Sequence, residues 1–193
     1  MPKTNNGFTK EFLSQIVNLK NSYLLSFATV GLLSHNDVVT ILRHDHLKTG
    51  GFTFYFSDIA SLIQKSKSNG NKDFEILVWE YLMFSSRSLF LYLYEGFKND
   101  NVRYEKVRDF DWFVFLANIR HSLAHGMDGI WNINDHGKPE IFYLRNDDKK
   151  KIIIDKKWDE TNMKFDQIGG WYTSIDLINF IEKEVNGYIS NNT

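Results

Sequence analysis

The chain has 193 residues, of which 42% are hydrophobic and 16% aromatic, a formal net charge of -1 and no cysteine. This composition excludes a disordered chain, and the near-neutral charge argues against a protein that coats nucleic acid without sequence preference. The missing cysteines exclude disulfides, thiolate nucleophiles and cysteine-ligated zinc. The length predicts one domain over residues 1–193.

Apolar residues recur at helical spacing in the first part of the chain. Thr9 predicts the N-cap of a first helix that ends near Leu33. A capping box beginning at Ser34 predicts a second, shorter helix, and Ser57 predicts the N-cap of a third. The polar run 65–72 predicts a loop.

Residues 73–98 predict a long helix that is apolar almost all round, as in the centre of a helical bundle. Its segment 76–94 is long enough to span a bilayer, but it contains Glu80 and Arg87. Each charge would cost roughly 2.5–3.5 kcal/mol near the centre of a spanning helix. The N-terminus also lacks the apolar region of a secretion signal. We therefore expect a cytoplasmic protein without a membrane segment.

The next helical pattern runs from about Tyr104 to His125 and ends at a glycine. Short β-favouring runs at 141–144 and 151–154 then predict a hairpin inside an irregular insertion over residues 130–172. Thr173 predicts the N-cap of a C-terminal helix. The expected fold is mainly α, a helical bundle with a β-hairpin inserted before the last helix.

The helix ending near His125 carries polar residues among its apolar ones. At about 100° per residue, a stripe within roughly 40° contains Asp111, Asn118 and His125, with Ser122 beside them and His121 at the border. Arg120 lies roughly 140° from His125 on an ideal helix. The two can meet if the arginine side chain reaches round, or at a site built between two copies of the chain.

The run from Arg120 to His125, RHSLAH, resembles the R-x4-6-H signature of the HEPN superfamily. This resemblance implies a helical bundle, and many such domains are metal-independent ribonucleases of toxin–antitoxin and phage-defence systems. It also implies a homodimer in which two motif helices face each other and form one RNA-cleaving site. Met127 stands where one branch of the family has an AMPylated tyrosine, so that regulation is not expected.

The resemblance implies that Arg120 and His125 are catalytic, with no metal and no cofactor. The polar stripe on the same helix predicts that His121, Asn118, Ser122 and Asp111 support them. The chemistry suits these residues. Histidine can accept the 2′-hydroxyl proton near neutral pH, and arginine can stabilise the added negative charge on phosphorus. A second histidine, His121 or one from a partner chain, could protonate the leaving 5′-oxygen. The expected products carry 2′,3′-cyclic phosphate and 5′-hydroxyl ends.

Other interpretations of the motif remain open. Cations near a helix C-terminus gain roughly 0.3–1 kcal/mol from the helix dipole, without any catalytic role. The chain could be an inactive HEPN-like module that binds RNA, a nucleotide or a protein such as an antitoxin, or an unrelated helical scaffold. His121 and His125 also have the i, i+4 spacing of metal ligands, but the third ligand would be arbitrary: Asp111, Asp135 or His136.

Two further groups of charged residues have a functional and a structural interpretation. Glu80 and Arg87 are seven residues apart on one helix face. They could support Arg120 or His125 from a second layer, or form polar contacts within the bundle. The lysines of the hairpin could contact RNA phosphates or simply face solvent: Lys149, Lys150 and Lys151.

Overall fold

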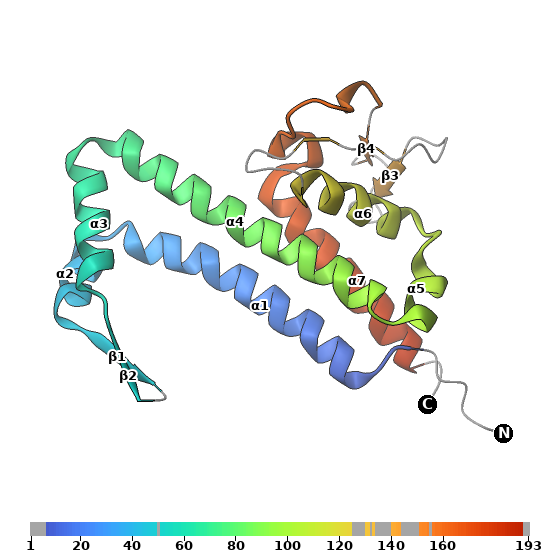
Figure 1. Ribbon diagram of the computed structural model, residues 1–193, viewed down its shortest axis with the longest axis horizontal. Helices are drawn as coiled ribbons and strands as arrows, with labels where there is room; N and C mark the ends of the chain where they lie inside the picture. The colour runs from blue at the N-terminus through green and yellow to red at the C-terminus, as the bar shows by residue number, and fades with distance from the viewer. Residues whose placement is uncertain are drawn as a thin grey trace. The chain divides into compact units, whose positions relative to one another are not determined.

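The computed structural model describes residues 7–49, 51–124, 130, 131, 133, 140–143, 151–154 and 156–190. The protein is mainly helical with a β-hairpin before the last helix, as the sequence predicts (Figure 1). Its contacts divide it into two compact units: unit 1 comprises residues 1–21 and 86–193, and unit 2 comprises residues 22–85. Two helices, α1 (Lys10–Leu33) and α4 (Asn71–Lys98), pass from one unit into the other.

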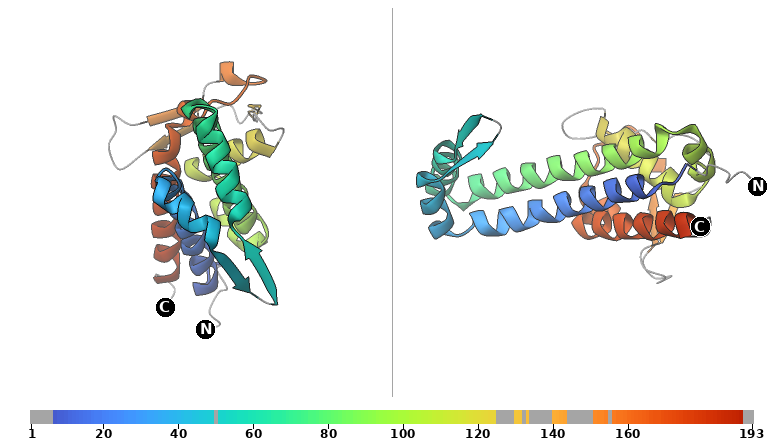
Figure 2. Two further views of the ribbon diagram at one scale, coloured as in Figure 1. Left: turned by 90° about the vertical axis from the view of Figure 1, so that its left-hand side faces the viewer. Right: turned by 90° about the horizontal axis from the view of Figure 1, so that it is seen from below.

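Unit 1 is a helical bundle with an aromatic core. Besides parts of α1 and α4, it contains α5 (Asn101–Val107), α6 (Asp111–Ala124) and α7 (Gly170–Ser190), as Figures 1 and 2 show. The ring of Phe97 on α4 is fully buried and lies 5.0 Å from Phe12, 5.3 Å from Trp112 and 5.8 Å from Phe113, centroid to centroid. This one side chain therefore joins α1, α4 and α6.

The last helix, α7, contacts both α1 and the segment just before α1. The rings of Phe8 and Tyr188 stack with centroids 4.5 Å apart and an interplanar angle of 8°. Lys20 of α1 forms an ion pair with Glu182 of α7. Burial, together with the nearby charge of Glu184, raises the pKa of the Tyr188 phenol.

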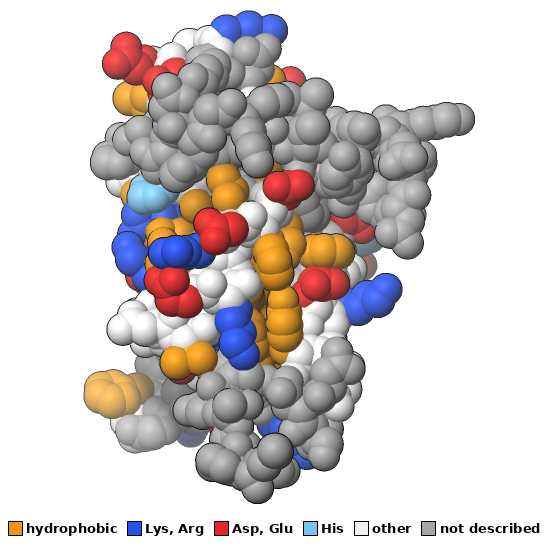
Figure 3. Space-filling model, turned by 90° about the vertical axis from the view of Figure 1, so that its right-hand side faces the viewer, with side chains coloured by type: hydrophobic (Ala, Val, Ile, Leu, Met, Phe, Trp, Pro, Cys, Tyr) orange, Lys and Arg blue, Asp and Glu red, His pale blue; other side chains and the backbone are white. Residues whose placement is uncertain are grey.

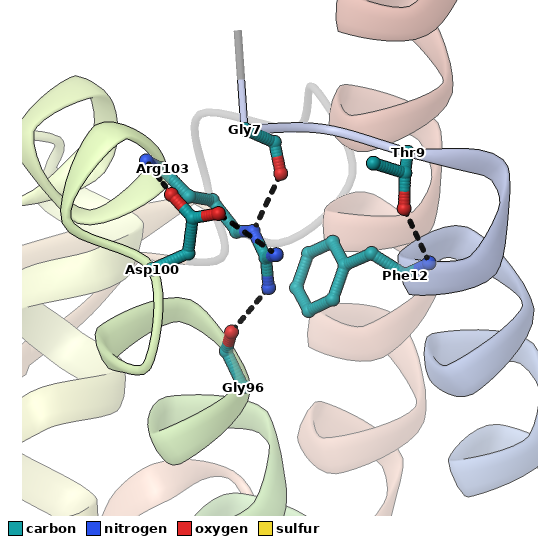
Figure 4. A network of polar contacts seen from close by, with 6 residues as sticks. All are labelled: Gly7, Thr9, Phe12, Gly96, Asp100 and Arg103. Atoms are coloured by element: carbon teal, nitrogen blue, oxygen red, sulfur yellow. Dashed lines mark hydrogen bonds and ion pairs between the residues drawn. The ribbon is translucent and has the colours of Figure 1, made fainter. Parts of the chain in front are cut away.

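Arg103 of α5 connects three segments of unit 1 (Figure 4). Its Nε donates to the Gly7 carbonyl at 2.9 Å, and its Nη1 donates to the Gly96 carbonyl in the last turn of α4. Its guanidinium carbon lies 3.6 Å from the centre of the Phe12 ring. Burial lowers the pKa of Arg103 while the Asp100 carboxylate opposes this shift, and arginine stays charged at neutral pH.

The insertion between α6 and α7 contains an antiparallel hairpin. Strand β3 (Glu140–Tyr143) pairs with β4 (Lys151–Ile154), and short 3-10 helices follow at Lys156–Trp158 and Phe165–Ile168. Trp131 anchors this insertion: its side chain is 1% exposed, and its Nε1 donates to the Gln167 side chain at 2.8 Å.

Unit 2 contains α2 (Asn36–His44), the hairpin of β1 (His46–Thr49) with β2 (Phe52–Tyr55), and α3 (Ser57–Ser68). It also includes the second half of α1 and the first half of α4. A small core joins α2 to α3 and consists of Val39, Ala60 and Ile63, with partly buried side chains around it. Lys67 donates to the carbonyls of Leu33 and Ser34 at 3.0 and 2.9 Å. These bonds provide hydrogen-bond donors for two carbonyls at the C-terminal end of α1.

Helix boundaries are where the sequence predictions were wrong most often. The predicted helix over 104–125 is divided in two: α5 ends at Val107, and a turn with a hydrogen bond from Phe110 N to Val107 O precedes α6. Asp100 starts α5 by accepting from Arg103 N at 3.0 Å. The segment predicted as a loop over 65–72 is largely helical, because α3 continues to Ser68 and α4 begins at Asn71.

Among the predicted caps, one is confirmed. Thr9 Oγ1 accepts from Phe12 N at 3.1 Å. Ser34 does not cap α2, because its hydroxyl donates to Val30 O and α2 has no side-chain cap. Ser57 is the first residue of α3, not its cap, and Thr173 lies buried inside α7, which begins at Gly170.

Among the described helices, α1 is long and apolar enough to cross a membrane when judged by length and composition alone. The core helix of a soluble protein meets the same criterion. The segment 76–94 of α4 does not meet this criterion, although α4 exposes several large apolar side chains.

Candidate functional site around Arg120

Helix α6 is buried on most of its circumference. Its core-facing residues include Phe115, Leu116 and Ile119, each 0% exposed. The predicted polar stripe is not a solvent-facing surface, because Asn118 is 1% exposed and Ser122 is 0% exposed.

Both of these polar side chains bond to their own helix. Asn118 Nδ2 donates to Val114 O at 3.0 Å, and Ser122 Oγ donates to Asn118 O at 2.8 Å. Such bonds to the carbonyl four residues earlier let a polar side chain enter a core without losing its hydrogen bonds. The two residues therefore stabilise the packing of α6, and neither faces solvent.

The half-exposed polar residues of α6 are Arg120 and His121, in its last turns. Arg120 Nη2 lies 2.7 Å from Glu95 Oε1 of α4, where the side chains are 24% and 39% exposed. Arg120 Nη1 lies 3.4 Å from Nδ1 of His121. The bond to Glu95 fixes the guanidinium in one position at the end of α6, next to an imidazole.

The ring of Tyr94 lies next to Arg120 and His121, which together with Glu95 form the cluster described here. Tyr94 is 5% exposed, and the Arg120 guanidinium carbon lies 5.2 Å from its ring centre. Lys98 Nζ lies 5.6 Å from the same ring, and the edge-on His121 ring is 5.9 Å away. Phe113 stacks on Tyr94 at 5.5 Å. The ring thus attracts two cations, and its stacking on Phe113 holds it in the core.

The guanidinium has hydrogen-bonding capacity beyond these contacts. Arginine has five N–H donors, and Glu95 and His121 engage one nitrogen each. Arg120 Nε is buried and has no hydrogen-bond partner among the described residues. Each terminal nitrogen carries two N–H groups, so an oxyanion could bind at the remaining donors of Nη1 and Nη2 without the Glu95 contact being lost.

Of the other predicted site residues, those with a described position outside the last turns of α6 are not gathered here. Asp111 is exposed in the first turn of α6, and Glu80 is exposed on the part of α4 that belongs to unit 2. Arg87 is half-buried on the part of α4 in unit 1. Lys151 begins β4. Outside the described residues lie His125, Lys149 and Lys150, and also the alternative zinc ligands Asp135 and His136.

Sequence reasoning missed Glu95, the residue in closest polar contact with Arg120. The available signal was a lone carboxylate in the apolar run that ends α4, LYLYEGFK. Glu80 gives the same signal in the same helix. The sequence alone could not tell which of them meets α6, because that depends on how α6 folds back onto α4 across α5 and the turns at its two ends.

Figure 3 views the protein from the side on which α5 lies. Among its coloured side chains, lysine and arginine alternate with aspartate and glutamate around a hydrophobic strip, and they form no large patch of one sign. Arg108, for example, pairs with Glu105 at 3.1 Å and with Asp109 at 3.6 Å. Within the described part of this side, the cations are therefore interspersed with carboxylates and do not form a broad basic surface.

No three histidine, aspartate or glutamate side chains lie close enough to hold a metal ion within the part of the chain that the structure describes. The described cluster can hold an anion and can exchange a proton through the imidazole of His121. No protein-family model matches the chain, and no curated protein or solved structure matches it significantly.

Proposed function

We propose that this protein is a metal-independent endoribonuclease of the HEPN type that acts as a homodimer, with Arg120 and His125 as its catalytic residues. One observation carries the proposal: the Arg120 guanidinium is half-exposed at the end of α6, held by Glu95 and adjacent to His121. This is an arrangement that can bind a phosphate next to a group able to transfer a proton.

In this mechanism the His125 imidazole accepts the proton of a ribose 2′-hydroxyl. The 2′-oxygen attacks the neighbouring phosphorus, the bond to the 5′-oxygen breaks, and an imidazolium returns a proton to that leaving oxygen. Arg120 donates hydrogen bonds to the phosphate oxygens as negative charge accumulates on them. His121, or a histidine of the second copy, is the proton donor. The products are a 2′,3′-cyclic phosphate and a 5′-hydroxyl.

Glu95 supports a second candidate function, an RNA- or nucleotide-binding module that does not cleave. The Glu95 carboxylate lies 2.7 Å from the Arg120 guanidinium and offsets part of its positive charge. That positive charge is what would stabilise a phosphorane-like transition state. Under this alternative, Arg120 binds a phosphate and no bond breaks. A possible protein partner, such as an antitoxin, would cover the same cluster.

The experiment that decides is cleavage of RNA by the purified protein in EDTA. The substrates are total RNA and an oligoribonucleotide in which 2′-deoxynucleotides block attack at chosen positions. We expect cleavage only where a 2′-hydroxyl is present, and cyclic phosphate ends. If the wild-type protein binds the oligonucleotide and leaves it intact, the ribonuclease proposal is wrong and the binding module is the function to adopt.

Matched variants test the residues. Arg120→Ala and His125→Ala are each expected to lower kcat at least a hundredfold, on the scale of one lost electrostatic or acid–base group. Arg108→Ala removes an exposed arginine and His44→Ala removes an exposed histidine, and neither should change the rate. If the site combines groups from two copies, mixing the two inactive variants should restore measurable cleavage. Undiminished cleavage by Arg120→Ala would refute the assignment.

A further inference from the structure

Lys98, the last residue of α4, lies beside the cluster of Arg120, His121 and Glu95. Its Nζ is 5.6 Å from the centre of the Tyr94 ring, and the Arg120 guanidinium carbon is 5.2 Å from the same centre. Because both distances end at one point, the two cations are no more than about 11 Å apart. Lys98 is exposed and forms no ion pair with a described residue, so its ammonium group is available to a ligand.

Helix geometry explains why Lys98 faces this cluster. Tyr94 and Lys98 are four residues apart, so they lie within about 40° of each other on one face of α4. Glu95 and Lys98 are three residues apart, which places them about 4.5 Å from each other along the helix axis. Lys98 therefore extends the face that contacts Arg120 by one turn, to the end of α4.

The carboxylates near Arg120 show why an anionic ligand would need Lys98. Glu95 lies 2.7 Å from the Arg120 guanidinium and offsets its charge, so this pair alone is close to neutral. Asp100, the next carboxylate after Lys98 in the chain, accepts from Arg103 N and lies 3.7 Å from the Arg103 guanidinium. Among these described side chains, Lys98 supplies the net positive charge that attracts a phosphate.

We infer that Lys98 binds a second phosphate of the RNA strand whose neighbouring phosphate is held by Arg120. The inference rests on the proposed function, because it starts from a phosphate on Arg120. Phosphates recur about every 3.4 Å along the axis of one stacked strand, so the distance between the two cations corresponds to no more than about three nucleotides. The ligand is therefore a polynucleotide strand and not a nucleoside monophosphate, which has no second phosphate for Lys98.

The chemistry of lysine indicates what this contact contributes. The ammonium group is a point charge on a flexible stem, so it can follow phosphates in different backbone conformations. Phosphate contacts position a strand and carry no direct sequence information. Lys98 is thus a positioning residue that adds affinity and salt dependence. A lysine in the last turn of a helix also interacts favourably with the helix dipole, but that structural role would not change the salt dependence of binding.

The salt dependence of RNA binding tests the inference. The probe is a fluorescein-labelled oligouridylate of about ten nucleotides, whose 2′-hydroxyls are methylated so that it cannot be cleaved by 2′-attack. Each phosphate contact on a single strand contributes about 0.7 to the slope of log Kd against log salt concentration. Lys98→Met should lower that slope by about 0.7 and weaken binding at low salt at least about tenfold. Lys98→Arg should retain the wild-type slope.

A matched control removes a lysine elsewhere. Lys183 is exposed on α7 in the same unit and outside the cluster, so Lys183→Met loses the same charge and keeps the same apolar stem. Its slope and affinity should equal those of the wild type. Circular dichroism and thermal denaturation verify that both methionine variants fold.

A mononucleotide separates the second phosphate from the first. Uridine 3′-monophosphate has one phosphate, which should bind at Arg120. Lys98→Met should therefore weaken the mononucleotide less than the oligouridylate, whereas Arg120→Met should weaken both. In cleavage of unmodified RNA, Lys98→Met should raise KM and leave kcat unchanged, because the lost contact holds the strand equally before and during the reaction.

Failure of this inference and failure of the ribonuclease proposal give different results. If unmodified RNA is cleaved while Lys98→Met retains the wild-type slope and KM, Lys98 contacts no phosphate and the ribonuclease proposal stands. If the slope falls as expected and unmodified RNA stays intact, the inference stands and the protein binds RNA without cleaving it. Equal losses for the mononucleotide and the oligouridylate would overturn the inference, as would a wild type that binds neither.

Discussion

Replacing Arg103 by methionine should destabilise unit 1 by about 3 kcal/mol. The substitution keeps the length and apolar stem of the side chain, so it removes mainly the guanidinium. That group donates to the carbonyls of Gly7 and Gly96 and lies 3.6 Å from the centre of the Phe12 ring. Gly96 O belongs to the last turn of α4, where carbonyls have no partner within the helix.

The magnitude follows from these contacts. A hydrogen bond from a charged donor is worth about 1.5–3 kcal/mol, and a desolvated cation–π contact about 2 kcal/mol. The guanidinium is also desolvated, which lowers its pKa, and this cost offsets part of the gain. Asp100 remains partly exposed and can rehydrate after the substitution. A net loss of about 3 kcal/mol corresponds to a decrease in Tm of roughly 6–12 °C.

Urea unfolding followed by tryptophan fluorescence measures this loss. Four of the five tryptophans lie in unit 1, and Trp79→Phe as a background removes the fifth, so that the signal then reports unit 1. Arg108→Met is the control, because Arg108 is 48% exposed and its ion pairs should contribute less than about 1 kcal/mol. If Arg103→Met and Arg108→Met cost the same, the contacts of Arg103 do not stabilise unit 1 as argued.

Three other predictions follow from contacts in unit 1. In a double-mutant cycle of Glu95→Gln and Arg120→Gln, unfolding free energies should show a coupling of about 1 kcal/mol, because both side chains are partly exposed; additivity would mean that the pair is not formed in solution. Tyr188 has a raised pKa, so its contribution to stability is complete below the usual tyrosine pKa of about 10 and is lost as pH rises through the folded value; Tyr188→Phe should flatten the alkaline limb of a pH–stability curve. Gly7 has φ +75°, and an added Cβ would lie 2.8 Å from a backbone nitrogen of α5. Gly7→Ala should therefore lower the free energy of unfolding, measured by thermal denaturation, by about 1–3 kcal/mol. Gly187→Ala in α7 is the control and should not destabilise the protein.

Helical periodicity predicts the long elements well because it follows from which side of a helix is buried. The first helix is confirmed from Thr9 to Leu33, and so is the hairpin before the last helix. Helix ends are harder. Ser34 and Ser57 each fit a capping pattern, yet Ser34 bonds back to the preceding turn and Ser57 is already helical. Local patterns offer several starting points for a helix, and packing selects among them.

The candidate site was partly visible in the sequence. Arg120 stood out because an arginine in an apolar helix is unusual, and the structure places it half-exposed near the end of α6, in contact with Glu95. Asn118 and Ser122 stood out for the same reason, but the Asn118 amide nitrogen and the Ser122 hydroxyl donate to carbonyls of their own helix. Glu95 could not be assigned, because its contact with Arg120 depends on how α6 folds back onto α4 after the turns at both ends of α5.

The stacking of Phe8 on Tyr188 also has a consequence for the folding of unit 1. The two rings are far apart in the sequence, so their contact closes a loop that contains α4, α5 and α6. Such non-local contacts form late, because the entropy of closing a long loop has to be lost before they stabilise the fold. We therefore expect helices that are neighbours in the sequence to pack first, and the aromatic core of unit 1 to be completed when α7 packs against Phe8.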